Sequence, residues 1–270
     1  MPLPLPSSLS PSKVAAFKDC ALSFRLSVID RVPEPPSPHA AKGTLVHRAL
    51  ELLMWEEEPA RRTERAALDK LERAVPEVLD GEEYRSLAWS GDERVEFVAD
   101  ARQLLSNYFL LEDPSRVRAI GTELRLSAEL GGLRLSGIID RLDLDEEGEL
   151  VVTDYKTGRA PSAPYEQSRL AGVHFYAFLC EQVLGRRPAR VQLLHLREPL
   201  VISTVPTDQS VRGLRQQASA VWAAVEQACR REDFRPKPGR LCSFCAYHQY
   251  CPAMGGDLSL LAPLAPAIAS

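Results

Sequence analysis

The segment between Val117 and Tyr155 constrains the fold of this chain more than any other. Three runs within it alternate apolar and polar residues as half-buried β-strands do: Val117 to Leu130, Leu133 to Leu144 and Leu150 to Tyr155. Two glycines at 131 and 132, and Glu-Glu-Gly at 146 to 148, predict tight turns between these runs. We therefore expect three consecutive strands that form a β-meander.

Helical periodicity flanks the meander on both sides. Before it, the pattern predicts a helix or helical hairpin at 12–29 and further helices at 43–55, 61–75 and 92–111. After it, the pattern predicts a helix at 164–184, strands at 190–196 and 200–205, and a long helix at 208–231. Because strands and helices follow each other in this order, we expect an α/β fold with a mixed central sheet flanked by helices.

The composition is that of a globular protein with one large domain. Hydrophobic residues make up 45% of the 270 residues, which is enough for a sizeable core. We expect a single domain over residues 12–254 with a helical insertion at about 56–112. The flanking segments 1–11 and 255–270 contain many prolines and few charges, and we expect them to be disordered tails.

Charge and hydropathy exclude some classes of protein. The formal net charge of -4 gives no overall sign of nucleic-acid binding, so contacts to DNA would have to come from local basic patches. No signal peptide and no apolar run of membrane-spanning length is found, which predicts a cytoplasmic protein without membrane contact. No Gly-rich phosphate-binding loop of the Walker type occurs, which argues against a nucleotide-driven motor.

Acidic residues stand at matching places on two neighbouring strands of the meander. The first strand carries Asp140, and the second carries Asp154 and Lys156 followed by Thr-Gly. Because side chains alternate along a strand, Asp154 and Lys156 point to the same face. A tight turn would bring Asp140 beside Asp154, where the two carboxylates repel each other unless a cation lies between them. Oxygen ligands of this kind suit Mg²⁺ or Mn²⁺.

Such a cation suits the hydrolysis of phosphodiester bonds. It lowers the pKa of a bound water and neutralises charge on the phosphate, while the Lys156 ammonium could orient the nucleophile or stabilise developing charge. An isolated Asp-x-Lys tripeptide is common, and these residues could equally end a strand and form salt bridges. The pairing of the two strands favours the functional interpretation.

His47 lies on an expected helix, in the sequence Gly43-Thr-Leu-Val-His47-Arg-Ala-Leu-Glu51. A helical histidine can be purely structural. A neutral imidazole could also complete the metal shell, with Glu51, one turn further on, as a partner for its other ring nitrogen.

Together these motifs resemble a known family. Four of them carry the resemblance: Gly43-x-x-x-His47, Gly137-x-x-Asp140-Arg141, Asp154-Tyr155-Lys156-Thr157-Gly158 and Tyr176-Ala177. They are similar to those of the RecB-like branch of the PD-(D/E)XK nuclease superfamily, over about Ser10 to Met254. The resemblance implies a restriction-endonuclease-like core and a Mg²⁺- or Mn²⁺-dependent deoxyribonuclease, an exonuclease of DNA repair or recombination.

The resemblance also implies roles for individual residues. His47, Asp140, Asp154 and the backbone carbonyl of Tyr155 would bind the metal, and Lys156 would be the catalytic lysine, so that His47, Asp140, Asp154 and Lys156 form the catalytic set. The substrate would be single-stranded DNA or DNA with free ends. Apart from the resemblance, the lack of a motor motif in this chain leaves a helicase partner as a candidate source of strand separation. The family often has a glutamine four residues before the position of Tyr176, where this chain has Gly172.

Cysteines cluster near the C-terminus. Cys242, Cys245 and Cys251 form a C-x2-C-x5-C pattern, which in a reducing compartment indicates a metal or iron-sulfur site rather than disulfides. Three thiolates need a fourth ligand, and Cys20 is the best candidate. Cys180 and Cys229 lie in apolar helical patterns and are expected to be small core residues.

The spacing alone leaves the occupant of this cysteine site open. It permits a zinc ion, around which His248 could replace one thiolate, or an iron-sulfur cluster. Resemblance to AddB-type and CRISPR-associated nucleases implies a 4Fe-4S cluster at Cys20, Cys242, Cys245 and Cys251, with zinc the less favoured occupant. The segment 236–254 would then bind the cluster and tie the two ends of the domain together.

A basic stretch precedes the cysteines and could contact phosphates. It contains Arg230, Arg231, Arg235 and Lys237, although such residues also serve simply as a solvated helix end. With Tyr176, these are the residues we expect to position DNA. The alternative function is a catalytically weak DNA-binding or scaffold protein that a structural metal cluster stabilises.

Overall fold

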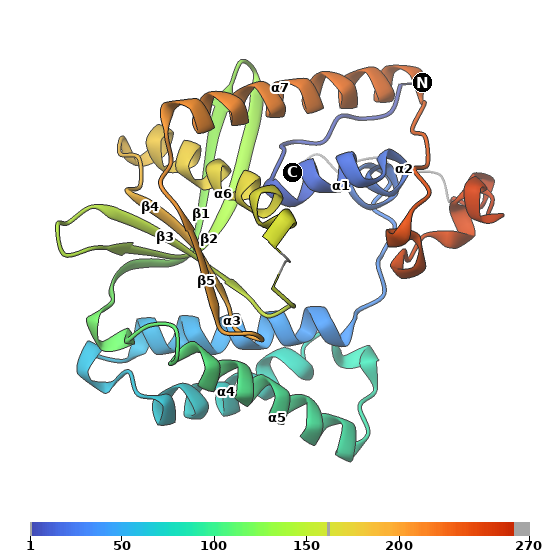
Figure 1. The fold of residues 1–270 in the computed structure, drawn as a ribbon. Helices are drawn as coiled ribbons and strands as arrows, with labels where there is room; N and C mark the ends of the chain where they lie inside the picture. The colour runs from blue at the N-terminus through green and yellow to red at the C-terminus, as the bar shows by residue number, and fades with distance from the viewer. Residues whose placement is uncertain (1, 161–162, 262–270) are drawn as a thin grey trace. The chain divides into compact units, whose positions relative to one another are not determined.

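The computed structural model describes residues 2–160 and 163–261, without the side chains of 163–171 (Figure 1). The chain forms two compact units. Unit 1 comprises Met1–Pro35, Glu129–Leu135 and Arg215–Ser270, and unit 2 comprises Pro36–Ala128 and Ser136–Leu214. Among the described helices, none combines the length and apolar character that crossing a bilayer requires.

A mixed five-stranded sheet forms the centre of the fold. Its strands lie in chain order: β1 (Arg118–Leu130), β2 (Leu133–Leu144), β3 (Leu150–Lys156), β4 (Arg190–His195) and β5 (Leu200–Thr204). β2 and β3 are antiparallel, β3 and β4 are parallel, and β4 and β5 are antiparallel. The parallel pair needs a crossover, which α6 (Ala163–Leu184) provides. The predicted meander and mixed sheet are confirmed.

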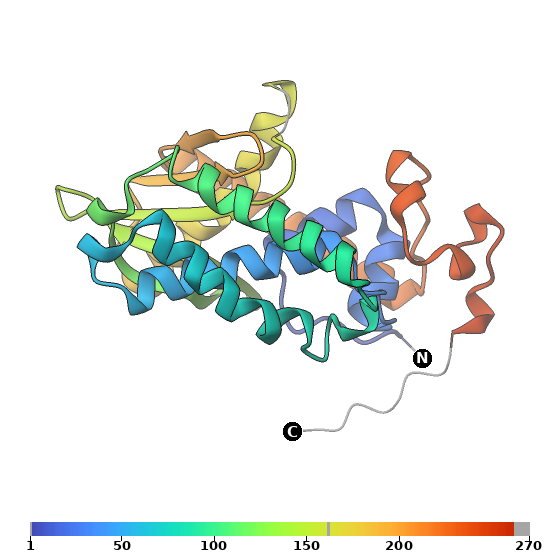
Figure 2. The same ribbon diagram turned by 90° about the horizontal axis from the view of Figure 1, so that it is seen from below.

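Three helices of unit 2 pack side by side (Figures 1 and 2): α3 (Pro38–Glu56), α4 (Glu64–Leu79) and α5 (Gly91–Tyr108). Their apolar faces share one core with Tyr155 of β3, Leu194 of β4 and Leu196 just beyond it. Because α3 belongs to this core, the side chains on its sheet-facing side lie next to the end of β3. The sheet and helices thereby bring motifs that are far apart in the sequence into one region.

The helix starts follow local capping chemistry. The Ser37 hydroxyl accepts a hydrogen bond from the Ala40 N–H, and Pro38 occupies the first turn, so α3 begins five residues before the predicted start at Gly43. Ser90 and Glu93 form a reciprocal capping box at the start of α5. α4 continues past Pro76 to Leu79, beyond the predicted end at residue 75. The long helix α7 (Asp208–Arg231) has the predicted bounds.

Unit 1 combines segments from both ends of the chain. Its helices are α1 (Pro11–Asp19), α2 (Ala21–Phe24) with a π-helical turn at Arg25–Ile29, and the later part of α7. Four short 3-10 turns follow, at Arg240–Phe244, His248–Tyr250, Pro252–Met254 and Leu258–Leu260.

Parts of the two expected tails lie among the described residues. In the N-terminal one, Leu9 is fully buried, and its N–H donates to the Arg134 carbonyl at 2.9 Å. In the C-terminal one, residues 255–261 are described, whereas residues 262–270 lie outside the described part of the chain.

Candidate functional site

The pairing of β2 with β3 brings Asp140 to the end of β3. Arg141 lies opposite Thr153 in the antiparallel register, and Asp140 directly precedes this paired stretch. The backbone N–H of Tyr155 donates to Oδ2 of Asp140 at 2.7 Å. The carboxylate of Asp140 is therefore held against the backbone of β3, as the predicted tight turn requires.

Asp154 and Lys156 form an ion pair on this strand. The Asp154 side chain is 6% exposed, whereas the Lys156 side chain is 40% exposed. The ammonium group is consequently open to solvent at the edge of the site while its partner is buried.

Tyr176 of α6 donates a long hydrogen bond of 3.5 Å to Oδ1 of Asp154. Gly137 leaves room for that tyrosine, since a Cβ at residue 137 would lie 3.2 Å from the Tyr176 ring and 3.1 Å from Leu179. Gly172, where the resemblance suggests glutamine, has nothing within 4 Å of the place a Cβ would take. Tyr176 therefore contacts the acidic site through Asp154.

His47 projects from α3 toward both strands. Its Nε2 lies 3.0 Å from the carbonyl oxygen of Tyr155, which can only accept a hydrogen bond. Its Nδ1 lies 3.6 Å from Oδ2 of Asp140 and 4.0 Å from Oε1 of Glu123. The imidazole thus bridges the end of β3 and a pair of carboxylates.

The sequence patterns did not indicate Glu123 of β1 as a site residue. Candidate ligand atoms of His47, Glu123 and Asp140 all lie within 4.8 Å of one another, and no other such group of histidine, cysteine and acidic residues occurs in the described part of the chain. The backbone φ of Glu123 is 47°, in the left-handed region that residues other than glycine rarely adopt. No local sequence pattern indicates this conformation in a strand.

The expected role of Glu51 is wrong. Its carboxylate accepts from the Arg48 guanidinium at 2.7 Å, and the carboxylates that face Nδ1 of His47 come instead from Asp140 and Glu123. A spacing of four residues places His47 and Glu51 on one face of the helix. Glu51 instead pairs with Arg48, three residues away, because a charge-assisted hydrogen bond is stronger than one to a neutral imidazole.

Burial and like charges shift the pKa values of these groups. Burial, followed by the charge of Asp154, raises the pKa of Asp140 well above its ordinary value. Burial also raises the pKa of Glu123, and it lowers the pKa of His47. Burial therefore makes ionisation of both carboxyls and protonation of the imidazole less favourable than in water, and a bound cation would offset this effect at the carboxylates.

A buried arginine, Arg141, joins the strands that carry the site. The Arg141 guanidinium is 1% exposed and donates to the Tyr155 hydroxyl at 2.7 Å, to Asp143 at 2.8 Å and to Glu112 at 2.9 Å. These bonds link β2, β3 and the segment after α5. Charged groups buried in this way are stable only when fully paired, so the network fixes the strands that carry Asp140 and Asp154.

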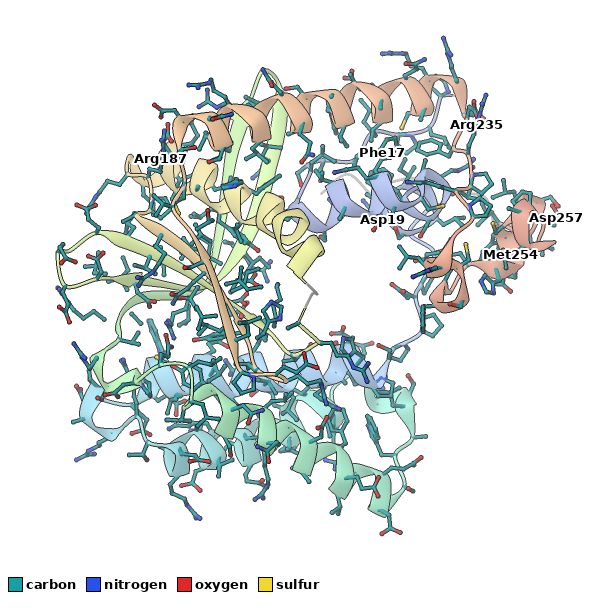
Figure 3. The ribbon with its side chains drawn as sticks, viewed as in Figure 1. Phe17, Asp19, Arg187, Arg235, Met254 and Asp257 are labelled. Carbon is teal, nitrogen blue, oxygen red and sulfur yellow. The ribbon has the colours of Figure 1, made fainter. Side chains whose placement is uncertain are left out.

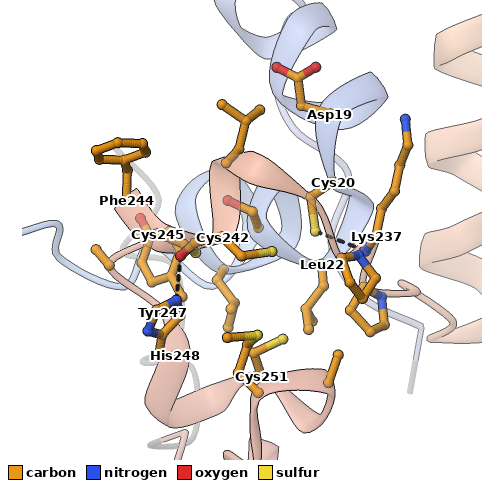
Figure 4. A pocket seen from close by; sticks show the side chains of 18 of the residues that line it. Asp19, Cys20, Leu22, Lys237, Cys242, Phe244, Cys245, Tyr247, His248 and Cys251 are labelled. Carbon is orange, nitrogen blue, oxygen red and sulfur yellow. Dashed lines mark hydrogen bonds between the residues drawn. The ribbon is translucent and has the colours of Figure 1, made fainter.

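The four predicted cysteines line one cavity of unit 1 (Figure 4). The cavity has a volume of about 290 Å³. Two backbone N–H groups point at sulfurs: that of Lys237 lies 3.5 Å from Sγ of Cys20, and that of Gly239 lies 3.3 Å from Sγ of Cys242. The cysteines are Cys20, Cys242, Cys245 and Cys251, all of them free thiols.

The spacing of these sulfurs is wider than one ion requires. Thiolates around a single tetrahedral zinc lie about 3.8 Å apart, given Zn–S bonds of about 2.3 Å. Within the described residues, no three cysteine sulfurs lie within 4.8 Å of one another.

Cys180 and Cys229 are buried and do not line this cavity, as predicted. His248 directs its Nε2 at the Cys242 carbonyl.

The predicted basic stretch belongs to unit 1. Arg230 and Arg231 are exposed in the last turn of α7, and Arg235 lies on the exposed segment that follows (Figure 3). Arg235 pairs with Asp233, and Nζ of Lys237 donates to the Lys18 carbonyl at 3.0 Å. Of these four basic residues, Lys237 therefore makes a hydrogen bond to α1.

Comparisons with known proteins agree with this fold. The family model of the PD-(D/E)XK nuclease superfamily matches residues 8–252. A solved structure from Eubacterium rectale, which carries the provisional name of an exonuclease, aligns with a TM-score of 0.52 at 12% identity. That alignment covers 89% of this chain and 88% of the other, and at this identity it shows the fold alone.

A second solved structure, named SSO0001, gives a TM-score of 0.37 at 12% identity, covering 80% of this chain and 95% of the other. No curated protein matches the chain.

Proposed function

Because the chain belongs to the PD-(D/E)XK nuclease superfamily, we propose that it is a metal-dependent deoxyribonuclease that acts as an exonuclease. One observation carries the proposal. His47, Asp140 and Asp154 come from a helix and two strands that are separate in the sequence, and they meet around the end of β3 beside Lys156. Buried carboxylates beside the partly exposed ammonium group of Lys156 suit cleavage of a phosphodiester.

The residues present fit a divalent cation of the Mg²⁺ or Mn²⁺ type. Asp140 and Asp154 offer oxygen ligands, the Tyr155 carbonyl lies 3.0 Å from the His47 ring, and the imidazole is kept neutral by burial. These are the ligands that the resemblance assigns, and their chemistry suits such ions. When bound, the cation supplies an activated water and neutralises phosphate charge.

Lys156 is the second functional element of this proposal. Its ammonium group is exposed where a phosphate would approach, and Asp154 holds it in place. A compact positive charge there stabilises negative charge that develops on the scissile phosphate. Tyr176 supports the same carboxylate and acts as a positioning residue, because its hydroxyl reaches Asp154 rather than the open side of the site.

For the cysteine cavity we propose a 4Fe-4S cluster held by Cys20, Cys242, Cys245 and Cys251. The lining of one cavity by all four cysteines supports a shared metal centre, and the resemblance to AddB-type nucleases favours a cluster over zinc. The two backbone N–H groups aimed at Cys20 and Cys242 are of the kind that stabilise cluster thiolates. Its role would be to tie the first helix to the C-terminal segment.

The proposed substrate is single-stranded DNA or DNA with free ends, processed during repair or recombination. Arg230, Arg231 and Arg235 are exposed and available to phosphates, with Lys237 beside them. Since the chain carries no Walker-type loop, a helicase partner would separate the strands.

The nuclease proposal is tested with DNA of matched sequence in linear and covalently closed circular forms. Purified protein with Mn²⁺ or Mg²⁺ should degrade linear single-stranded DNA and leave circles intact, and the Asp154→Ala variant should lose this activity. Cutting of circles would replace the exonuclease assignment with an endonuclease one. Intact DNA in every condition would favour the scaffold alternative.

The cluster proposal is tested by protein purified without oxygen. We expect a brown protein with broad visible absorbance and about four irons per chain, following the four-cysteine ligand set. A colourless protein that contains one zinc would contradict it.

A further inference from the structure

We infer that Glu123 is a further ligand of the divalent cation, so that the site includes the first strand of the sheet as well as β2, β3 and α3. This inference rests on the proposed metal-dependent function and names a residue of the same site. The backbone of β1 is unusual at this residue. Within the described residues, four residues other than glycine have a positive φ, namely Arg31, Ala88, Glu123 and Glu232, and only Glu123 of these lies within a strand.

A left-handed residue inside a strand interrupts the alternation of side chains. Such irregularities redirect a side chain, and they occur often beside active sites. The left-handed conformation costs about 1–2 kcal/mol for a residue with a Cβ. Here it brings Oε1 of Glu123 to 4.0 Å from Nδ1 of His47.

The tautomer of His47 determines what Glu123 faces. Nε2 lies 3.0 Å from the Tyr155 carbonyl, so the hydrogen of a neutral imidazole must sit on Nε2 for that bond to form. Nδ1 then carries a lone pair. It faces the carboxylates of Asp140 at 3.6 Å and Glu123 at 4.0 Å, which are also acceptors when ionised.

Three acceptors therefore converge, and the Tyr155 backbone N–H donates to one of them, Oδ2 of Asp140, at 2.7 Å, which leaves the negative charge of the carboxylates without a cation beside it. In the described part of the chain, no lysine or arginine nitrogen lies within 4.0 Å of the Glu123 or Asp140 carboxylate, and the nearby Lys156 is paired with Asp154. One imidazole nitrogen and two carboxylate oxygens within 4.8 Å are a ligand set for one divalent ion. A small inward movement would bring all three to bonding distance.

The geometry also gives the Tyr155 carbonyl a second role. By accepting from Nε2–H it fixes the ring orientation of His47, as a carbonyl behind a metal-bound histidine commonly does. Nδ1 is then the nitrogen available to the cation. Glu123 and Asp140 supply charge, and His47 supplies a neutral ligand, from three separate elements of unit 2.

The test measures Mn²⁺ binding directly, by calorimetry and by the loss of the free-ion electron paramagnetic resonance signal, without DNA. Glu123→Gln keeps the shape of the side chain and removes its charge, and we expect Mn²⁺ to bind it at least about tenfold more weakly. Glu129→Gln is the matched control, since Glu129 is an exposed residue of the same strand, and it should bind as the wild type does.

A second variant separates binding from folding. Glu123→Gly accepts the left-handed backbone without strain, so its metal-free melting temperature should stay within a few degrees of the wild type while Mn²⁺ affinity still falls. Wild-type affinity in both Glu123 variants would overturn the inference and leave the proposed nuclease intact. A wild-type protein that binds no Mn²⁺ would instead contradict the metal dependence of the proposed function.

Discussion

At the residue scale, the site depends on groups whose charges are unfavourable until a cation balances them. Asp140, Asp154 and Glu123 lie near one another, and the ammonium of Lys156 pairs with one of them. Asp140, Asp154, Lys156 and His47 could be selected from the sequence because each lies in a motif with a fixed local spacing. Glu123 could not, since its position depends on one unusual backbone angle.

The raised pKa values of Asp140 and Glu123 predict a pH dependence of metal stabilisation. A carboxyl whose pKa is higher in the folded state binds its proton more tightly there, so its contribution to stability is lost as pH rises from the ordinary value toward the raised one. Mn²⁺ competes with those protons. Calorimetric melting should show a larger Mn²⁺-induced increase in melting temperature at pH 7.5 than at pH 5; an equal increase at both would contradict this.

Lys156→Ala should separate catalysis from metal binding. Its side chain is 40% exposed, so its removal should leave the melting temperature nearly unchanged. Loss of the positive charge should lower the rate of DNA cleavage by about 10²- to 10³-fold, in the range found for removing one transition-state donor. Mn²⁺ affinity should be equal or higher because Asp154 loses its ion-pair partner. A cleavage rate close to wild type would argue that Lys156 only solvates the strand end.

At the element scale, the sequence predicts which segments become helices and strands better than it predicts their details. The alternation of apolar and polar residues, together with the turn glycines, is enough to predict the strands β1 to β3. Helical periodicity is enough to predict α7, whose bounds are as predicted. The start of α3 was misjudged because Ser37 and Pro38 act through capping rather than periodicity. The Arg141 network joins strands and a loop through tertiary contacts, which a local pattern does not contain.

Gly137 tests how β2 and α6 share space at the site. Alanine there would place a Cβ 3.1 Å from Leu179 and 3.2 Å from Tyr176, so it should displace the tyrosine from Asp154. We expect Gly137→Ala to lower the free energy of unfolding by about 1–3 kcal/mol, as overpacking does, and to slow DNA cleavage.

Gly213→Ala provides the matched control in α7. Nothing lies within 4 Å of its new Cβ, and alanine favours a helix over glycine by about 0.8–1 kcal/mol, so stability should rise slightly. Denaturant unfolding measures both variants. Equal stability of Gly137→Ala and the wild type would show that the ring of Tyr176 adjusts without cost.

At the scale of the whole molecule, the two units divide the proposed chemistry. Unit 2 holds the acidic site, and unit 1 holds the cysteine cavity together with the basic stretch. The spacing of residues in the sequence predicted both the acidic site and the cysteine site, but it did not indicate that the chain forms two units. That division arises because segments far apart in the sequence, such as residues 2–35 and 215–261, belong to the same compact unit.

Loss of one cluster ligand should destabilise unit 1. A metal cluster that joins Cys20 to the segment around Cys242 closes a long loop of the chain. Cys20→Ser should therefore lower the free energy of unfolding by on the order of 2–5 kcal/mol, as loss of a native disulfide does. Iron content and visible absorbance should fall with it. Cys180→Ala, a buried thiol that does not line the cavity, is the control that keeps its iron. Full iron content in Cys20→Ser would exclude that residue as a ligand.

We propose above all that the acidic site of unit 2 cleaves DNA with the help of a divalent cation. The most direct measurement is the rate at which an end-labelled linear single-stranded oligonucleotide is shortened in Mn²⁺, with wild type and Asp140→Asn purified side by side. We predict shortening by the wild type that a chelator abolishes, and a rate at least about 10³-fold lower for Asp140→Asn, which removes a charged ligand. Equal rates for the two proteins, or an intact oligonucleotide with both, would contradict the claim.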